Sequence, residues 1–154
     1  MNIFYLSHDV EECAKWHVDR HCVKMILETA QLLSTTHWLL GQEAPYKATH
    51  INHPVSKWTR HSLSNYKWLA NLGLSLVREY SFRYEKKHKT LPALEWLQKN
   101  QPCIEDIGFT KPALAMPDEF KDDDPIIAYR IFYNIGKKHL HKWKKREVPL
   151  WIIH

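Results

Sequence analysis

The sequence is poor in cysteine, in glycine and in long apolar runs, and each shortage excludes a class of protein. Its 154 residues include 3 Cys and 4 Gly. The widely spaced Cys13, Cys22 and Cys103 form no disulfide framework, which favours a reducing, cytoplasmic setting. No apolar run approaches the ~20 residues of a membrane span, and no signal-peptide pattern opens the chain. We therefore expect one compact domain over residues 1–154 that does not interact with membranes.

Strand-like alternation is also nearly absent, apart from "NIFYL" near the start of the chain. Apolar residues instead recur at helical spacing in four segments, residues 10–40, 54–87, 91–100 and 125–145. Asp9, Pro54 and the Asp124-Pro125 pair are typical helix starts, and we expect one break near residues 18–21 and a bend near Gly73. The pattern predicts an all-α bundle of about four to five helices, two of them long.

Basic and aromatic residues are abundant where other types are scarce. The 22 Lys and Arg exceed the 17 Asp and Glu, which gives a net charge of +5, and 11 His add to it below neutral pH. The 7 Trp, 7 Tyr and 5 Phe supply core material or a surface that binds flat rings. This balance favours nucleic acid or a nucleotide as the partner, without distinguishing DNA from RNA.

The stretch "WHVDRHCVKMILETAQLL", residues 16–33, carries a polar stripe on a mostly apolar helix. On a helical wheel the stripe consists of His17, His21, Lys24, Glu28, Gln31 and Thr35. A helix that is apolar over so wide an arc is largely buried, so its polar stripe is expected to line a cleft. The alternative is a solvated face on which Lys24 and Glu28 form an ordinary i, i+4 pair.

The same stretch also raises the possibility of a metal site. His17 and His21 stand four residues apart, as on metalloprotease helices, and a third ligand could come from His50 or His53. Those helices carry a Glu directly after the first His, and this chain has a valine there. Cys22 falls on the apolar flank and is better explained as a core residue. We therefore expect neither a metal nor another cofactor.

A second polar stripe follows on the segment that begins at Pro54. It consists of His53, Lys57, Arg60, His61, Ser64, Lys67, Asn71, Ser75 and Arg78. A solvated face usually mixes charges of both signs, so a stripe without any acid favours contact with phosphate. The basic run "GKKHLHKWKKRE", which includes Lys137, is explained equally well by phosphate contact and by a solubilising helix end.

Two segments together resemble the pyrimidine-dimer DNA glycosylase (phage endonuclease V-like) superfamily. They are "DRHCVKMILETAQLL", residues 19–33, and "NHPVSKWTRHSLSNYKWLANLGLSLVREYSFRYEKKH", residues 52–88. With "MPDEF" and "AYRIFY" near the end, most of the chain also resembles a group of uncharacterised phage and bacterial proteins. The superfamily resemblance implies an all-α protein that binds duplex DNA through basic residues and flips a nucleotide out of the stack.

The resemblance also implies a chemistry. In that superfamily the N-terminal amine attacks the sugar carbon, a Glu on an early helix assists, and a Schiff base permits strand cleavage. Here Asn2 normally leaves Met1 in place, so Met1 would carry the amine, although "MNIFYL" is typical of a buried segment. Glu28 is the only acid in the polar stripe, about one turn later than the family pattern places it.

The leading hypothesis is an enzyme that acts on a damaged or modified base or nucleotide in nucleic acid. Glu28 would serve as general base or oxocarbenium stabiliser, with His21 as its acid–base partner. The residues expected to bind nucleic acid or phosphate are Lys24, Asn52, His53, Arg60, Lys67, Tyr129, Arg130, Tyr133 and Lys137. Among these, Tyr129, Arg130 and Tyr133 would supply stacking and charge. The alternatives are a non-catalytic binding protein for nucleotides or nucleic acid, and an enzyme for a free nucleotide.

Overall fold

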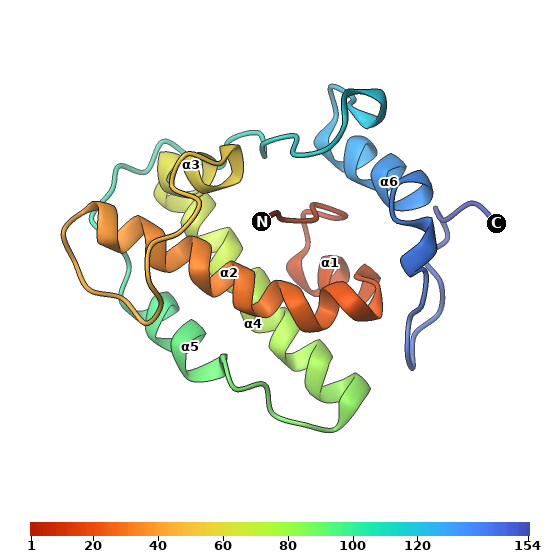
Figure 1. Ribbon diagram of the computed structural model, residues 1–154, viewed down its shortest axis with the longest axis horizontal. Coiled ribbons are helices and arrows are strands. Elements are labelled where there is room, and N and C mark those ends of the chain that lie inside the picture. Colours follow the sequence, from red (N-terminus) through yellow and green to blue (C-terminus); the bar gives the residue numbers. More distant parts are fainter.

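The computed structural model describes residues 1–154 and contains helices and loops but no strand (Figure 1). Its helices are α1 (Val10–Trp16), α2 (Asp19–Leu39), α3 (Pro54–His61), α4 (Leu63–Tyr84), α5 (Leu91–Lys99) and α6 (Pro125–Ile135), with short 3-10 turns η1 (Asp118–Phe120) and η2 (Lys138–Leu140). The all-α prediction is confirmed, and the number of α-helices is six rather than four to five. None of them is both long and apolar enough to cross a lipid bilayer.

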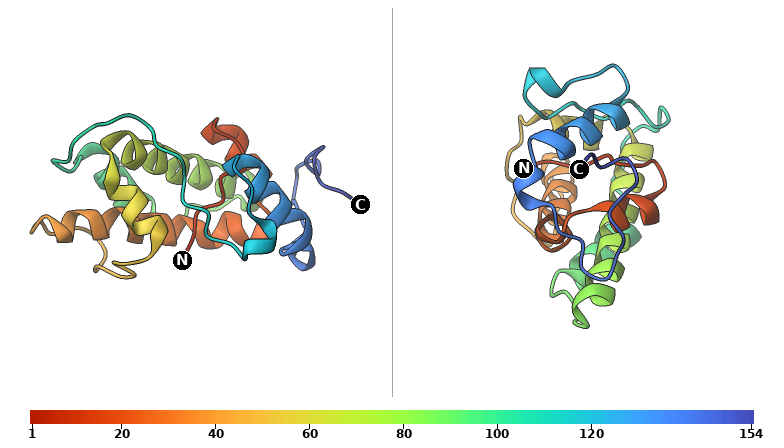
Figure 2. Two further views of the ribbon diagram at one scale, coloured as in Figure 1. Left: turned by 90° about the horizontal axis from the view of Figure 1, so that it is seen from above. Right: turned by 90° about the vertical axis from the view of Figure 1, so that its right-hand side faces the viewer.

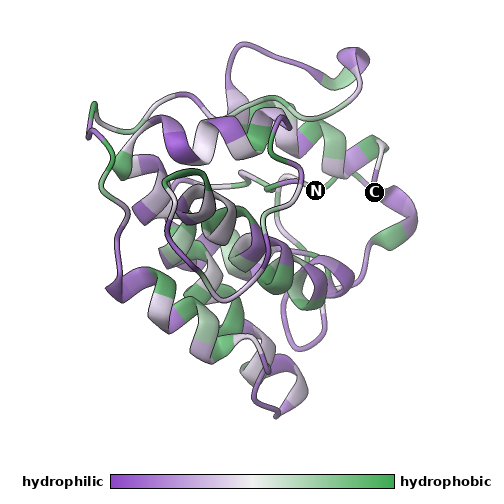
Figure 3. Cartoon of the chain, turned by 60° about the vertical axis from the view of Figure 1, so that its left-hand side comes forward, coloured by the Kyte–Doolittle hydropathy of each residue, from purple (hydrophilic) through white to green (hydrophobic).

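The two long helices, α2 and α4, pack against each other in the middle of the molecule, and α1, α3 and α5 all contact α4 (Figures 1 and 2). The N-terminus lies in the space bordered by α2, α3 and α6 (Figure 1). The buried apolar side chains form a continuous cluster from Ile3 to Ile152, so the N-terminal segment shares the core of the helices. Hydrophobic and hydrophilic residues alternate along the helices, as expected when each buries one face (Figure 3).

Side-chain caps start the helices where the sequence predicts them. The Asp9 side chain accepts hydrogen bonds from the backbone N–H groups of Glu11 and Glu12, and Asp124 does the same for Ile126 and Ile127. The chain leaves the helical conformation at His17, between α1 and α2, close to the predicted break. These starts are local signals, which explains why the sequence reveals them.

The prediction of a single helix over residues 54–87 is wrong. The helical conformation is interrupted at Ser62, which separates α3 from α4. Ser62 is extended, and the first turn of α4 finds its partners in a distant loop. Glu105 accepts from the Leu63 N–H at 3.0 Å, and Asp106 accepts from the Ser64 hydroxyl at 2.6 Å. At Gly73 the helix packs closely instead: a Cβ there would lie 2.9 Å from side-chain atoms of α2 and of α5, which would have to shift.

The last helix is shorter than predicted, since α6 ends at Ile135 and not near residue 145. The Lys137 N–H donates to the Phe132 carbonyl at 3.0 Å, and the His141 ring donates from Nε2 to the Tyr133 carbonyl at 2.7 Å. These bonds satisfy carbonyls that a longer helix would have bound, and the chain turns away through η2. The "NIFYL" segment forms no strand either, because no neighbouring strand is present to pair with it.

A buried arginine ties α1, α2 and α4 together. Arg83 of α4 is fully buried and donates from Nε to the Glu79 carboxylate at 2.7 Å. Its Nη1 donates to Asp19 at 2.9 Å and to the His17 carbonyl at 2.8 Å, and its Nη2 donates to the Lys15 carbonyl at 2.9 Å. One guanidinium thus satisfies the end of α1, the first residue of α2 and a buried acid on its own helix.

Replacing this arginine is expected to cost most of the stability of the fold. Arg83→Met should lower the free energy of unfolding by about 3–5 kcal/mol, because Glu79 would keep a buried charge with only Arg146 to pair with it. Urea denaturation measures the change. The matched control is Arg78→Met, an exposed arginine on the same helix, which should stay within about 0.5 kcal/mol of the parent. A loss below about 1 kcal/mol for Arg83→Met would contradict this account.

His17 at the α1–α2 turn is a second buried polar group. Its ring is inaccessible to solvent, donates from Nδ1 to the Cys13 carbonyl at 2.7 Å and leaves Nε2 without a partner. Burial is the main reason why the pKa of His17 falls to about 4. The folded protein therefore keeps this imidazole neutral at pH values where the unfolded chain protonates it.

This difference predicts a stability loss in mild acid. As pH falls from 6.5 towards 4, the unfolded state takes up a proton that folded His17 does not, which destabilises the fold by about 1.4 kcal/mol per pH unit. Between pH 6.5 and 5 the loss is about 1.6 kcal/mol, because the unfolded imidazole is only half protonated at pH 6.5. Urea denaturation across this range should show a shallower pH dependence for His17→Asn, whose amide can still donate to Cys13. Equal slopes for the two proteins would refute the prediction.

Candidate functional site

The N-terminal segment lies along the polar stripe of α2. The α-amine of Met1 is 3.4 Å from Glu28 Oε1, and the Phe4 ring stacks on His21 with a centroid distance of 4.0 Å and an interplanar angle of 11°. Glu28 and His21 are seven residues apart, so they share one face of α2 with about 10 Å of helix between them. Because Met1 contacts Glu28 and Phe4 contacts His21, the segment runs along α2 in the direction opposite to the helix.

Glu28 is held between two cations of different exposure. Its Oε1 faces the Met1 amine, and its Oε2 lies 3.7 Å from Nζ of the exposed Lys24. The Glu28 side chain is only 12% exposed and the Lys24 side chain is 68% exposed. The Lys24–Glu28 pair of the solvated-face interpretation therefore exists, but the carboxylate belongs to a largely buried site.

An amine beside a buried carboxylate is chemically useful. The carboxylate can accept a proton from the ammonium group and leave a nucleophilic amine. The same negative charge can stabilise a positive charge that develops on a sugar ring during bond cleavage. Glu28 is therefore placed for either of the roles expected of it, with the Met1 amine as its closest partner.

His21 is a neutral imidazole with one engaged nitrogen. Its Nδ1 lies 2.7 Å from the hydroxyl of the fully buried Tyr133. Burial lowers the pKa of His21 to about 2, and the charges of His17, Lys137, Lys24 and Arg20 act in the same direction. This environment favours a hydrogen-bond donor over the acid–base role expected for His21, because the ring stays neutral near pH 7.

His53 is an expected binding residue whose pKa the charge of the Met1 amine helps to lower. Its Nδ1 accepts a hydrogen bond from the Val55 N–H at 3.1 Å and so caps α3. Burial, followed by the charges of the Met1 amine and His50, lowers the pKa of His53. This coupling places His53 in the electrostatic environment of the amine, with the exposed Asn52 next to it in the chain. Arg60, two turns further along α3, donates to Ser56 at 3.0 Å.

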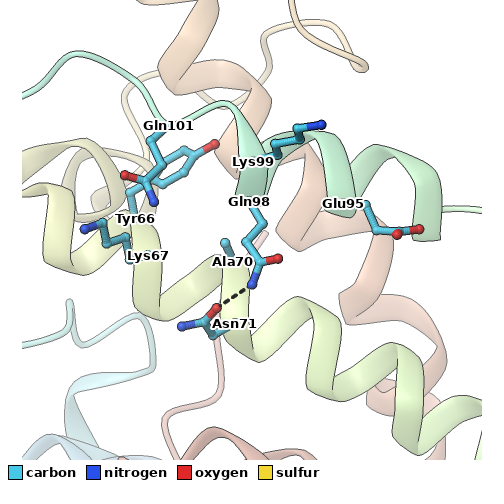
Figure 4. A pocket seen from close by; sticks show the side chains of 8 residues that line it. All are labelled: Tyr66, Lys67, Ala70, Asn71, Glu95, Gln98, Lys99 and Gln101. Atoms are coloured by element: carbon cyan, nitrogen blue, oxygen red, sulfur yellow. Dashed lines mark hydrogen bonds between the residues drawn. The ribbon is translucent and has the colours of Figure 1, made fainter.

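Lys67 belongs to a different place in the molecule. It lines a pocket of about 600 Å³ between α4 and α5, shown in Figure 4. The lining residues are Tyr66, Lys67, Ala70, Asn71, Glu95, Gln98, Lys99 and Gln101. Asn71 and Gln98 are joined across it by a hydrogen bond of 2.9 Å. This pocket contains neither Met1 nor Glu28, so Lys67 lines a hollow apart from their contact.

The aromatic residues expected to stack on a base are core residues. Tyr129 and Tyr133 are fully buried, so neither ring presents a face to a ligand. Arg130 is also engaged within the protein, since its guanidinium lies 5.0 Å from the Trp16 ring and 5.2 Å from the Trp151 ring. The prediction of a stacking surface on the last helix is therefore wrong. The side chains of Tyr129, Arg130 and Tyr133 on α6 face the N-terminal segment and the C-terminal residues instead.

The metal site considered for residues 17–22 does not form. His17 and His21 each use Nδ1 for a hydrogen bond within the protein, and Cys22 is fully buried. No group of three or more His, Cys, Asp or Glu side chains comes close enough together anywhere in the chain to hold a metal ion. The donor set of this region therefore fits hydrogen bonding and not metal coordination.

The sequence gives little sign of three contacts at this site. The Met1 amine meets Glu28, the Phe4 ring covers His21, and the Tyr133 hydroxyl binds His21 across 112 residues of chain. The apolar pattern of "MNIFYL" indicates that the segment is buried, which residues 3–7 confirm. It does not indicate the helix against which the segment packs.

Comparison of the chain with protein-family models, with curated proteins and with solved structures gives no match. The site is therefore defined by its own geometry: the Met1 amine paired with a largely buried carboxylate, an exposed lysine beside the pair, and a neutral histidine two turns away on the same helix.

Proposed function

We propose that this protein is an enzyme that acts on nucleic acid by a glycosylase-type reaction, with the Met1 α-amine and Glu28 as its catalytic pair. The observation that carries the proposal is the 3.4 Å contact between the amine and a carboxylate that is almost withdrawn from solvent. The resemblance of residues 19–33 and 52–88 to the pyrimidine-dimer DNA glycosylase superfamily supports the same chemistry.

The reaction begins with a proton transfer. Glu28 accepts a proton from the Met1 ammonium group, and the free amine attacks C1′ of a nucleotide that has left the base stack. A nitrogen–carbon bond forms as the glycosidic bond breaks, and the departing base keeps the bonding electrons and takes up a proton. Opening of the sugar ring then gives a Schiff base between Met1 and C1′.

The charge distribution supports a polyanionic substrate. The chain carries a net charge of +5, and the exposed Lys24 borders the catalytic pair. Asn52 and His53 lie at the start of α3, and the charge of the Met1 amine contributes to the lowered pKa of His53. Cations around a single buried carboxylate favour a phosphate-bearing ligand, because phosphate balances charges that the protein leaves unpaired.

Trapping with borohydride tests the nucleophile. Intact-mass analysis first identifies the residue that carries the free α-amine. The protein is then incubated with borohydride and duplexes that carry an abasic site or one of several damaged or modified bases. We expect a covalent adduct that peptide mapping places on the Met1 nitrogen. An adduct on a lysine side chain, or none with any duplex, would rule out the proposed nucleophile.

Glu28→Gln tests the carboxylate in the same assay. Adduct formation should slow by about 100-fold or more, since general acid–base catalysis contributes that much, while duplex affinity stays close to that of the parent. Glu11→Gln, at an exposed acid of α1, is the matched control and should trap at the parent rate. Salt-sensitive duplex binding without adduct or product would instead indicate a non-catalytic binding protein. Tight binding of a mononucleotide with weak duplex affinity would indicate an enzyme for a free nucleotide.

A further inference from the structure

The His21–Tyr133 pair is a built polar arrangement that the proposed reaction leaves unused. The Val18 N–H donates to the Tyr133 hydroxyl oxygen at 3.3 Å, and this hydroxyl lies 2.7 Å from His21 Nδ1. Burial raises the pKa of Tyr133 well above its ordinary value, so the phenol keeps its proton. Because its oxygen already accepts from Val18, the hydroxyl donates its proton to Nδ1.

This arrangement fixes the tautomer of His21. Nδ1 is an acceptor and the ring is neutral, so the imidazole proton resides on Nε2. His21 Nε2 has no hydrogen-bond partner in the protein. Three polar side-chain atoms are both fully buried and without a partner, and His21 Nε2 is not one of them: they are His17 Nε2, Thr36 Oγ1 and Trp151 Nε1. The Nε2–H group therefore keeps some access to solvent although His21 as a whole is only 4% exposed, and the Phe4 ring covers one face of the imidazole.

The surroundings of this donor are positively charged. Arg20, Lys24 and Lys137 all act on His21 as cations, and their charges are among the main causes that lower its pKa, after burial. Lys137 Nζ lies 5.9 Å from the centroid of Phe4, the ring that stacks on His21. An uncharged donor beside three cations is complementary to an anion.

The distance from the catalytic pair is suitable for a neighbouring phosphate. His21 and Glu28 share a face of α2 with about 10 Å between them. A nucleic-acid strand advances about 3.4 Å per nucleotide, so a nucleotide held at Met1 and Glu28 has phosphates of nearby nucleotides within this range. The same face of the helix thus reaches both positions.

We propose that His21 Nε2–H, with Lys24 and Lys137, binds a phosphodiester near the nucleotide held at Met1 and Glu28, and that Tyr133 positions the imidazole for this contact. The position of the phosphate relative to the reacting nucleotide rests on the proposed function. Tyr133 is a positioning residue, because it acts only through the proton on His21.

Methylphosphonate scanning tests the contact. The probes are duplexes with one uncleavable abasic-site analogue and a single neutral methylphosphonate, moved one position at a time along the strand. Fluorescence anisotropy at fixed salt gives the affinity of each duplex. One position should weaken binding to the parent protein about tenfold or more, since it removes the charge that the donor and the cations contact.

Three variants assign that phosphate to His21. His21→Leu should bind the unmodified duplex about tenfold more weakly than the parent does. A methylphosphonate at the sensitive position should then cause no further loss of affinity in this variant. His21→Gln should keep the parent pattern, because its amide can place an N–H close to the position of Nε2. Tyr133→Phe should weaken duplex binding when it is introduced into the parent protein. It should have no such effect when it is introduced into His21→Gln. The exposed His154→Leu is the matched control and should bind as the parent does.

The outcomes separate this inference from the proposed reaction. A Met1 adduct without any phosphate position coupled to His21 overturns the anion site and leaves the reaction intact. A phosphate position coupled to His21, without an adduct on Met1, overturns the reaction and supports the anion site. The inference is overturned if His21→Leu loses the same affinity on every duplex. It is also overturned if His21→Gln shows the same affinities as His21→Leu. So does nucleoside monophosphate binding as tight as duplex binding. Circular dichroism confirms folding, and His21→Gln and Tyr133→Phe decide the matter if His21→Leu does not fold.

Discussion

Burial of the N-terminal segment against α2 is the constraint on which the rest of the structure depends. Residues 3–7 are buried, and the Phe4 ring contacts His21 on one side and Phe132 and Tyr133 of α6 on others. The segment therefore supplies the apolar surface between α2 and α6. Its extended course also determines where Met1 lies, because the anchored Phe4 leaves only three residues to reach Glu28.

The position of the polar stripe depends in turn on the start of α2. Arg83 binds Asp19, the first residue of that helix, and the His17 carbonyl before it, while Arg146 binds the other side of Glu79. A rotation of α2 would break these buried charge-assisted bonds, so the helix has one orientation about its axis. His21 and Glu28 consequently face the N-terminal segment, whereas Thr29, one position on, faces α4 near Gly73.

The sequence reveals what local interactions determine. The helical class, the caps at Asp9 and Asp124 and the polar stripe that contains Glu28 all follow from spacing and short-range chemistry. The break at Ser62 does not, because the groups that replace its helical bonds lie more than 40 residues away, in the loop around Asp106. Tertiary packing likewise decides that Tyr133 is buried and that Lys67 faces α5, since helical periodicity alone cannot distinguish a core face from a ligand-binding face.

The same packing explains how one helix face can hold both an anionic and a cation-rich position. At Glu28 the buried carboxylate balances the Met1 amine and part of the charge of Lys24. At His21 the hydrogen-bond partner is the uncharged Tyr133 hydroxyl, and burial and the charges of Arg20, Lys24 and Lys137 keep the ring neutral. A protonated imidazole there would add a fourth positive charge, and its Nδ1 would lose the hydrogen bond it accepts. In the proposed reaction, therefore, the neutral state of His21 lets phosphate approach one end of the stripe while Glu28 serves the amine at the other.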